Sequence, residues 1–390
     1  MAYPIDRRTF LRRGARGLGG AAALGLAGPA LLEACSSSKS SSSTATTAAA
    51  GSATTAASSG STAAPGSTAA PGSLGALNFV GPWIPDVETG GEYVADSKGF
   101  WTQQGFSGVT VIPSGPNAPA QEQMIATGKG LVGITSLDST GAAIQKGLNI
   151  VCIGAQYQKN PFCIMSAATK PINTPQDMIG KKIGVQSPND AVWAAFLQAN
   201  NIDASKVTKV SVGFDPTPLT QGTVDGWFSF ITNEPIELGL KGFKTATFLL
   251  ADYNYPEVGN AYICTTDSLK TARAKVKAAM IGDILGWKET LTNPVEASTL
   301  AGQKGQGLSL KQEELQADSQ AALIVTADSK ASGLFYVTPT AQAANIKTLG
   351  LGGTTVTAAQ LFDMSLLDEI YQDANLKSVP TPVPSGATLS

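Results

Sequence analysis

The sequence of 390 residues contains no histidine. Histidine is the commonest general base in enzymes and the commonest ligand of transition metals, so its absence removes Ser-His and Cys-His nucleophile pairs. A hydrolase that uses only carboxylates is still compatible with the sequence, but no pair of acidic residues stands out for that role. We therefore expect a protein that is not an enzyme, with no catalytic residue, no metal site and no cofactor.

Arginine is almost absent after the first sixteen residues. The one arginine that follows is Arg273, in "TTDSLKTARAK", where an exposed helix is expected. Sites for nitrate, sulfonate or phosphate often use the arginine guanidinium group, because it donates two parallel hydrogen bonds. Backbone amides at helix N-termini also bind anions. The scarcity of arginine thus favours a neutral ligand without excluding an anion.

Long apolar runs and basic clusters are missing after residue 35. No stretch there reaches about 18 uninterrupted apolar residues, so no transmembrane helix is expected in it. The segment before residue 35 holds five arginines and two acidic residues, so the remaining chain is more acidic than the net charge of −2 of the whole sequence. Nucleic acid is therefore not an expected partner.

The first 35 residues have the pattern of an export signal. The basic "DRRTFLRR" precedes the uncharged "GLGGAAALGLAG", and Arg7-Arg8 with Phe10-Leu11 mark the twin-arginine version. The segment from Leu32 to Cys35 resembles a bacterial lipobox, which implies cleavage before Cys35 and acylation of its thiol. This predicts an extracytoplasmic protein in the cell envelope, attached to the membrane by a lipid anchor. The alternative is an ordinary cleavage site that leaves Cys35 free.

Residues 36–76 consist almost wholly of Ser, Thr, Ala, Gly and Pro. This composition has no apolar periodicity and buries too little surface to offset chain entropy, so we expect a disordered tether. A flexible chain of about 40 residues has a root-mean-square span of about 35 Å. Such a tether is long enough to hold a folded domain clear of a lipid surface.

Three cysteines follow the tether: Cys152, Cys163 and Cys264. An exported protein can hold a disulfide, and the similar short apolar runs around Cys163 and Cys264 favour a strand pairing between them. Three disulfide pairings are possible. The alternative is that the thiols are buried and free.

From residue 77 onward, short apolar strands alternate with helices. Strands are predicted at "ALNFVG", "GVTVIPSG" and "LVGITSLDS", and helices at "GGEYVADSKGFWTQQG", "APAQEQMIATGKG" and "STGAAIQKG". A second series contains the strands "KKIGVQ" and "VTKVSVGF" around the helix "AVWAAFLQANN", and residues 268–375 are expected to be mostly helical. The alternation predicts an α/β fold with mostly parallel sheets, whose ligand loops follow the carboxyl ends of strands.

Two segments resemble a known family. The stretch "GEYVADSKGFWTQQGFSGVTVIPSGPNAPAQEQMIATGKGLVGITSLDS" is similar to the opening lobe of periplasmic solute-binding proteins of the thiamine-precursor, sulfonate and nitrate group. The later stretch "INTPQDMIGKKIGVQ" is similar to the element that opens their second lobe. The two motifs stand in the family's order, and the resemblance covers most of residues 77–300.

The resemblance implies a two-lobed periplasmic-binding-protein fold of type II. Lobe 1 would comprise residues 77–166 and 263–390, and lobe 2 residues 167–262, each a mostly parallel sheet flanked by helices. Two strands that cross between the lobes are expected near residues 162–168 and 261–266.

The implied function is ligand capture for an ABC importer. The ligand would bind in the cleft between the lobes, and closure would present the monomeric protein to a permease with its ATPase. A sensor of the same fold, without transport, is the alternative. A related enzyme family makes the pyrimidine precursor of thiamine by consuming a histidine of its own, which this chain lacks.

The segments "PWIPDVETGGEY" and "VDGWFSFITNEPIEL" resemble those that contact the ligand in relatives that bind thiamine pyrimidines and related flat nitrogen heterocycles, a class that includes flavins. Trp83, Tyr93 and Trp227 are candidates for stacking on such a ring. Asp86 and Glu234 are candidates to accept hydrogen bonds from its amino or ring N–H groups. The remaining candidates are polar side chains at predicted strand ends and beside Glu234: Ser136, Gln156, Ser187, Asn189 and Asn233.

Two further expectations concern the first of these segments. Gly90 and Gly91 are expected to let the backbone turn close to the ligand before a helix begins. The competing interpretation of Trp83 is an anchor in the hydrophobic core. Within the same fold, the competing ligand is a small sulfonate or nitrate held by backbone amides.

Overall fold

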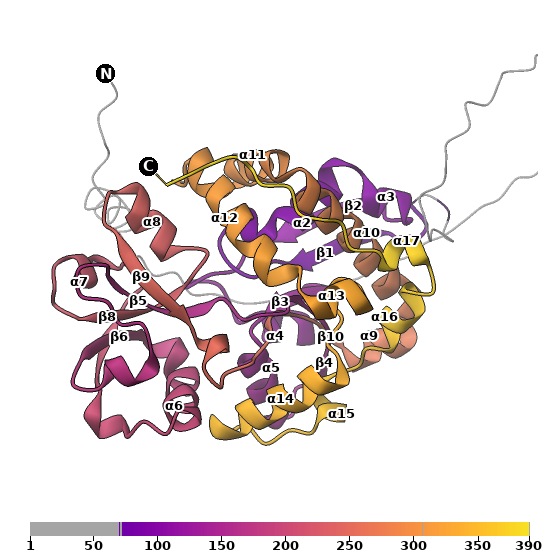
Figure 1. Ribbon diagram of the computed structural model, residues 1–390. Helices are drawn as coiled ribbons and strands as arrows, with labels where there is room; N and C mark the ends of the chain where they lie inside the picture. The colour runs from indigo at the N-terminus through magenta and orange to yellow at the C-terminus, as the bar shows by residue number, and fades with distance from the viewer. Residues whose placement is uncertain (1–69, 71, 306, 390) are drawn as a thin grey trace, which may run out of the picture. The chain divides into compact units, whose positions relative to one another are not determined.

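The computed structural model describes residues 70, 72–305 and 307–389 (Figure 1). The expected export signal, Cys35 and nearly all of the expected tether lie outside these residues. The folded chain begins before the expected boundary at residue 77, because the Leu74 N–H donates to the Gly105 carbonyl at 2.9 Å and Ala76 is the first residue of a strand. In the part of the chain that is described, no helix combines the length and the apolar character needed to cross a bilayer.

The first sheet contains five strands in the order β2-β1-β3-β10-β4. Their bounds are β1 Ala76–Val80, β2 Gly108–Ile112, β3 Val132–Thr135, β4 Ile150–Tyr157 and β10 Gly259–Thr265. β1 pairs in parallel with β2 and β3, whereas β10 runs antiparallel to β3 and β4. All residues of β4 are buried, as is typical of a strand covered on both faces. This sheet and its helices form lobe 1.

The second sheet has the order β7-β6-β8-β5-β9. Its strands are β5 Phe162–Ala167, β6 Lys182–Gln186, β7 Thr208–Val212, β8 Gly226–Phe230 and β9 Thr245–Leu249. β6 is parallel to β7 and β8, whereas β5 is antiparallel to β8 and β9. Both sheets therefore follow one plan, with a single antiparallel strand in the fourth position. This confirms the predicted α/β fold with mostly parallel sheets.

The chain passes between the sheets in loops, and not in the crossing strands expected near residues 162–168 and 261–266. β5 pairs only with strands of the second sheet and β10 only with strands of the first. The two connections are residues 158–161 and 250–258, and the Asn160 N–H donates to the Glu257 carbonyl at 3.1 Å. The crossings therefore lie a few residues before the positions that the resemblance implied.

The three described cysteines are buried and free. Cys152 lies on β4 and Cys264 on β10, both in the first sheet, whereas Cys163 lies on β5 in the second. The expected strand pairing of Cys163 with Cys264 is therefore wrong. Burial raises the pKa of Cys152 and of Cys264 to about 12, as expected for inert structural thiols.

Helices flank both sheets, and the helical prediction for residues 268–375 is confirmed. Lobe 1 contains α2 Gly90–Ser97, α3 Phe100–Gln103, α4 Gln121–Ala126 and α5 Leu137–Gln145 before the crossing, and after it α9 Thr266–Thr271, α10 Arg273–Thr292, α11 Pro294–Lys304, α12 Leu310–Ile324, α13 Ala327–Ser332, α14 Pro339–Leu351, α15 Ala358–Leu361, α16 Ser365–Ile370 and α17 Ala374–Lys377. Lobe 2 contains α6 Asp190–Ala199, α7 Thr217–Thr220 and α8 Glu234–Leu240.

Glycines set the distance between α2 and α10. A Cβ atom on Gly91 would lie 2.2 Å from the Trp287 ring, and one on Gly286 would lie 2.1 Å from the Gly91 carbonyl oxygen. Gly90 has helical φ and ψ angles and is the first residue of α2. The Gly90-Gly91 pair therefore serves helix packing, and the expected turn of this pair toward a ligand is wrong.

Candidate functional site

The loop after β1 brings buried carboxyl groups to the carboxyl end of the first sheet. Asp86 caps the short 3-10 helix η1 (Val87–Thr89), where its Oδ1 accepts from the Glu88 N–H at 2.9 Å. Glu88 is 7% exposed, and its Oε1 accepts from Asn260 Nδ2 at 2.8 Å. Gln156 Nε2 donates to the Glu88 carbonyl at 3.1 Å. These contacts join the loop after β1 to strands β4 and β10.

One face of α12 presents buried polar side chains to the same loop. Glu313, Gln316 and Gln320 follow the spacing i, i+3 and i+7, which places them on one side of a helix. Glu313 Oε2 accepts from the Val87 N–H at 2.7 Å, and Gln320 Nε2 donates to the Val87 carbonyl at 2.8 Å. Gln316 Nε2 donates to Asn233 Oδ1 of lobe 2 at 2.9 Å. α12 therefore contacts both the β1 loop and lobe 2.

Lobe 2 contributes an acidic side chain at the carboxyl end of β8. Glu234 is the first residue of α8, and its Oε2 accepts from Ser229 Oγ at 2.7 Å and from the Phe230 N–H at 3.1 Å. Burial raises the pKa of Glu234, and burial, with a smaller contribution from the charge of Glu234, raises the pKa of Glu88. Glu88 and Glu234 therefore come from different lobes and interact electrostatically.

Two aromatic rings also meet across the lobes. The centroids of Trp83, in the β1 loop, and Phe214, which follows β7, are 5.3 Å apart, and their planes are inclined at 60°. Trp83 is half-buried and Phe214 is 41% exposed.

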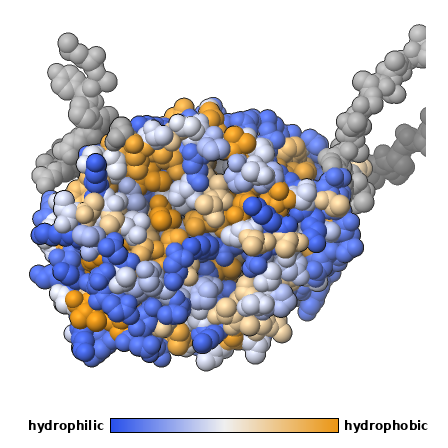
Figure 2. All heavy atoms as spheres, viewed as in Figure 1, coloured by the Kyte–Doolittle hydropathy of each residue, from blue (hydrophilic) through white to orange (hydrophobic). Residues whose placement is uncertain are grey.

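Hydrophobic residues form several separate patches on the face drawn in Figure 2. No single apolar surface on that face marks a binding site. The location of the candidate site is therefore inferred from the polar contacts described above.

Burial without a compensating cation shifts the protonation of these acids. It raises the pKa of Glu88 and of Glu313 to about 7, and that of Asp86 well above its ordinary value. Within the described part of the chain, no lysine or arginine hydrogen-bonds or ion-pairs with Asp86, Glu88, Glu234 or Glu313. Such an environment suits hydrogen-bond donors on a ligand better than an anion.

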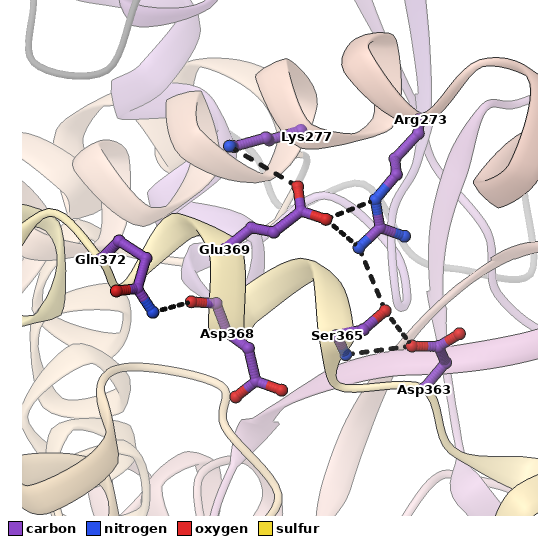
Figure 3. Close-up of polar contacts among 7 residues, drawn as sticks. All are labelled: Arg273, Lys277, Asp363, Ser365, Asp368, Glu369 and Gln372. Atoms are coloured by element: carbon purple, nitrogen blue, oxygen red, sulfur yellow. Dashed lines mark hydrogen bonds and ion pairs between the residues drawn. The ribbon is translucent and has the colours of Figure 1, made fainter.

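Arg273 is engaged elsewhere, at the start of α10. Figure 3 shows its guanidinium group against α16, where Nε donates to Glu369 Oε1 at 2.7 Å and Nη2 donates to Ser365 Oγ at 3.1 Å. Lys277 lies on the other side of the same carboxylate, with 3.7 Å between Nζ and Oε2. The partly exposed Arg273 therefore helps to fasten α16 to α10.

The structure brings five of the predicted residues into this region: Trp83, Asp86, Gln156, Asn233 and Glu234. Ser136, at the end of β3, makes only local contacts as the N-cap of α5. Tyr93 is 7% exposed and packs with Val94 and Ala297 in a cluster between α2 and α11. Trp227 is fully buried against Met165 and Leu238 in the core of lobe 2. Neither Tyr93 nor Trp227 therefore has a ring free to stack on a ligand.

The other two predicted residues make local contacts in lobe 2. Ser187 is exposed, with its Oγ 3.5 Å from Ser211 Oγ, and Asn189 Nδ2 donates to Gln186 Oε1 at 3.0 Å. Among the described residues, neither side chain hydrogen-bonds to the acidic cluster around Glu88. Both lie in the short 3-10 helix η3 (Ser187–Asn189), between β6 and α6.

Several residues of the site were not predicted from the sequence: Glu88, Phe214, Asn260, Glu313, Gln316 and Gln320. The last three carry a usable signal, because polar residues at i, i+3 and i+7 form a stripe that is buried here. Asn260 has a φ of 52°, a conformation that asparagine tolerates better than most residues. Across the described chain, no cluster of three or more Cys, Asp or Glu side chains is arranged to hold a metal ion.

Comparisons with known proteins agree with this architecture. The sequence model of the NMT1/THI5-like family matches residues 87–297, more than half of the chain. The riboflavin-binding protein RibY of Chloroflexus aurantiacus is 26% identical over 232 residues, which cover 56% of this chain and 63% of that protein. The formylaminopyrimidine-binding protein of Halalkalibacterium halodurans is 23% identical over 220 residues, which cover 55% of this chain and 66% of that protein. The chain thus spans slightly less than two thirds of each relative.

Among solved structures, the periplasmic aliphatic sulphonate binding protein SsuA of Escherichia coli superimposes with a TM-score of 0.56. The superposition covers 75% of this chain and 99% of that one, at 17% sequence identity. This likeness extends over both lobes and establishes the periplasmic-binding-protein fold.

Proposed function

Because the chain belongs to the NMT1/THI5-like family, we propose that it is the substrate-binding component of an ABC importer. It captures a small, flat nitrogen heterocycle, such as a thiamine pyrimidine precursor or a flavin, between its two lobes. The two relatives described above are named for riboflavin and formylaminopyrimidine, which are both of this class. In this proposal the protein is a monomer that delivers its ligand to a permease with its ATPase.

The observation that carries the proposal is the pair of carboxyl groups of Glu88 and Glu234. They belong to different lobes and have amide, hydroxyl and backbone N–H partners instead of cations. Their oxygens are suited to accept hydrogen bonds from the ring and amino N–H groups of a heterocycle. A sulfonate or nitrate at the same place would face carboxyl groups, and its binding would be opposed by like charge.

The aromatic rings complete this assignment. Trp83 and Phe214 contact each other across the lobes, so a flat ring can stack between them only after the lobes have opened and the two rings have moved apart. Stacking of this kind contributes about 0.5–1.5 kcal/mol beyond the burial of the rings. The amide groups of Asn233, Asn260 and Gln156 supply both donors and acceptors around the ring edge. Ligand contact therefore involves both lobes, as closure around a ligand requires.

We further propose that the protein binds its ligand without changing it. The chain has no histidine, and the Ser229 hydroxyl, which donates to Glu234 at 2.7 Å, is only 2% exposed. The buried thiols are far from reactive, since burial raises the pKa of each of them. A sensor of the same fold is the second candidate, and measurements of ligand uptake in cells with and without this protein distinguish the two.

A thermal-shift screen of the mature protein tests the ligand class. Riboflavin and 4-amino-5-hydroxymethyl-2-methylpyrimidine are the heterocyclic probes, and methanesulfonate and nitrate are the anionic probes. We expect a heterocycle to raise the melting temperature, and calorimetric titration then gives its affinity. If an anion stabilises the protein and the heterocycles do not, the proposed ligand class is wrong.

Two substitutions on α8 locate the binding. Glu234→Gln removes an ionisable acceptor at the proposed site, and hydrogen bonds to charged groups contribute about 1.5–3 kcal/mol, so affinity should fall about 10- to 100-fold. Glu237→Gln is the matched control, because Glu237 lies on the same helix and forms a surface ion pair with Lys241. Equal losses in both variants would contradict the assigned role of Glu234.

A further inference from the structure

The chain after α17 runs as an extended segment across the surface. Residues 379–389, here called the C-terminal strap, contain no helix or strand, and three of the first six are prolines: Pro380, Pro382 and Pro384. Proline fixes φ near −65° and favours the stiff polyproline II conformation. Figure 1 shows the strap passing over α10 and α11 and ending beside α8. It therefore begins on lobe 1 and ends at lobe 2.

Two contacts fasten the middle of the strap to lobe 1. The Val383 N–H donates to the carbonyl of Leu291, in the last turn of α10, at 2.8 Å. Ser385 makes two hydrogen bonds to the carboxylate of Asp318 on α12, from its N–H to Oδ1 and from its Oγ to Oδ2, each at 2.7 Å. A double hydrogen bond to one carboxylate fixes the direction of the strap as well as its position.

The end of the strap contacts lobe 2. A Cβ atom on Gly239 would lie 3.0 Å from both terminal methyl groups of Leu389. The leucine side chain therefore packs directly against the backbone of α8 at Gly239. Gly239 belongs to α8, the helix that begins with Glu234. Leu389 is 49% exposed, so its contact with α8 buries only part of the side chain and contributes a small free energy.

Both ends of α8 are therefore connected to α12. At its beginning, Asn233 accepts a hydrogen bond from Gln316, and near its end, Gly239 contacts the strap that Asp318 holds. A stiff segment with three prolines loses little conformational entropy when it is held in this position. Release of one weak contact at Leu389 would free the end of α8 without disturbing the hydrogen bonds to Asp318.

We propose that the C-terminal strap is a reversible latch between the lobes, which holds α8 against α12 and is released at Leu389 when the lobes separate. The latch goes beyond ligand capture, because it shifts the balance of open and closed forms toward the closed form in the absence of ligand. It acts through Leu389 and Gly239 on lobe 2, and through Ser385 and Asp318 on lobe 1.

Interlobe distances in the ligand-free protein test this proposal. Spin labels at Lys146→Cys on lobe 1 and Gln198→Cys on lobe 2, in a full-length Cys35→Ser background, report the separation; the other cysteines are buried. Leu389→Ala and deletion of residues 386–390 should each shift the distance distribution to longer values. Val383→Ala is the matched control, because Val383 is equally exposed at 49% and contacts lobe 1 through its backbone N–H.

A double-mutant cycle checks that the strap acts as one unit. Ser385→Ala removes one of the two hydrogen bonds to Asp318 and should produce a shift in the same direction as Leu389→Ala. Combined with Leu389→Ala it should add no further shift, because the latch is already open. Identical distance distributions in all variants, or fully additive shifts, would overturn the proposal. The outcome does not depend on which ligand the protein binds.

Discussion

Three glutamates in the candidate site share one kind of environment. Glu88, Glu234 and Glu313 each accept hydrogen bonds from neutral donors. The donor to Glu88 is the amide of Asn260, and Glu234 accepts from the Ser229 hydroxyl and a backbone N–H. Glu313 accepts from the Val87 N–H. Burial away from cations disfavours the ionised form of each acid and raises its pKa. The charge of the site therefore changes in the neutral pH range.

This environment predicts that the protein becomes less stable as pH rises from 5 to 8. The pKa of Glu88 and of Glu313 rises from about 4.5 to about 7 on folding. Between these values the folded state holds protons that the unfolded state has lost, so the stabilisation present below pH 4.5 is lost as pH passes 7. Burial raises the pKa of Asp283 to about 8, which extends the same trend.

Urea denaturation at pH 5, 6, 7 and 8 measures this effect. The free energy of unfolding should fall by a few kcal/mol over the range, since a tenfold difference in an acid's ionisation constant between the folded and unfolded states corresponds to about 1.4 kcal/mol. Glu313→Gln should flatten the dependence, because glutamine keeps an acceptor for the Val87 N–H and does not titrate. A stability that rises with pH over this range would show that these acids are ionised in the folded state.

The role of Trp83 gives a second prediction at the residue scale. Trp83→Ala should weaken binding of the heterocyclic ligand by about 1–3 kcal/mol, with a modest loss of stability, because the ring is half-buried and contacts the exposed Phe214. Trp101→Ala is the contrasting variant. Trp101 is fully buried, its Nε1 donates to the Ala279 carbonyl at 2.8 Å, and its loss should cost about 3–5 kcal/mol of stability.

Calorimetric titration beside a denaturant melt separates these effects. A Trp83→Ala variant with unchanged affinity and strongly reduced stability would identify Trp83 as a core anchor. The stacking role would then pass to Phe214 alone.

Among the helices, the crossing of α2 and α10 holds the β1 loop in place. Gly91 on α2 and Gly286 on α10 allow the two backbones to approach closely, and Trp287 packs against the space beside Gly91. The helix α2 begins directly after η1, which carries Glu88. The packing of α2 on α10 therefore fixes where the acidic residues of the loop lie.

We expect Gly286→Ala to destabilise the protein by about 2–3 kcal/mol, because the added Cβ would lie 2.1 Å from a backbone oxygen that cannot move without shifting α2. Gly302→Ala on α11 is the control, since no atom lies within 4 Å of its added Cβ. There the higher helix propensity of alanine should stabilise the protein by about 0.5–1 kcal/mol. Denaturant melts of the two variants give the comparison, and equal effects would contradict the close contact.

For the whole molecule, the two lobes repeat one sheet plan and contribute different groups to the candidate site. Lobe 1 supplies Trp83, Glu88 and the polar face of α12, whereas lobe 2 supplies Phe214 and Glu234. The contacts between them described above include the ring pair of Trp83 with Phe214 and the hydrogen bond from Gln316, in the middle of α12, to Asn233. This arrangement suits a protein whose lobes move relative to each other when ligand binds.

Attachment to a membrane is predicted from the segment that ends at Cys35. Cys35→Ser should remove the acylated thiol and release the protein from the membrane fraction, because each buried methylene of an acyl chain contributes about 0.8 kcal/mol to membrane binding. Fractionation of cells that express each form, followed by mass measurement of the N-terminal peptide, tests this. A serine variant that stays in the membrane fraction with its signal removed would show that the anchor lies elsewhere.

The sequence alone determined the α/β class, most of the early strands and the helical C-terminal part. Alternating apolar runs are local patterns, and helix α11 shows why such prediction succeeds: Pro294 begins the helix and Gly305 follows its last residue, Lys304. The same patterns missed β8 and β9 and indicated only the end of β4, at Gln156. Two of these, β4 and β8, are almost fully buried strands without polar alternation, which periodicity cannot distinguish from other apolar runs.

Only the tertiary structure decided which side chains meet. Trp83 and Trp227 both stand among aromatic and polar residues in the sequence, yet one lies at the interface between the lobes and the other in the core of lobe 2. Glu313 contacts the Val87 N–H across 226 residues of sequence. Absence of histidine and scarcity of arginine limited the chemistry from the start, because composition is independent of folding. The arrangement of the remaining acids and amides depends on long-range packing, and no local pattern contains it.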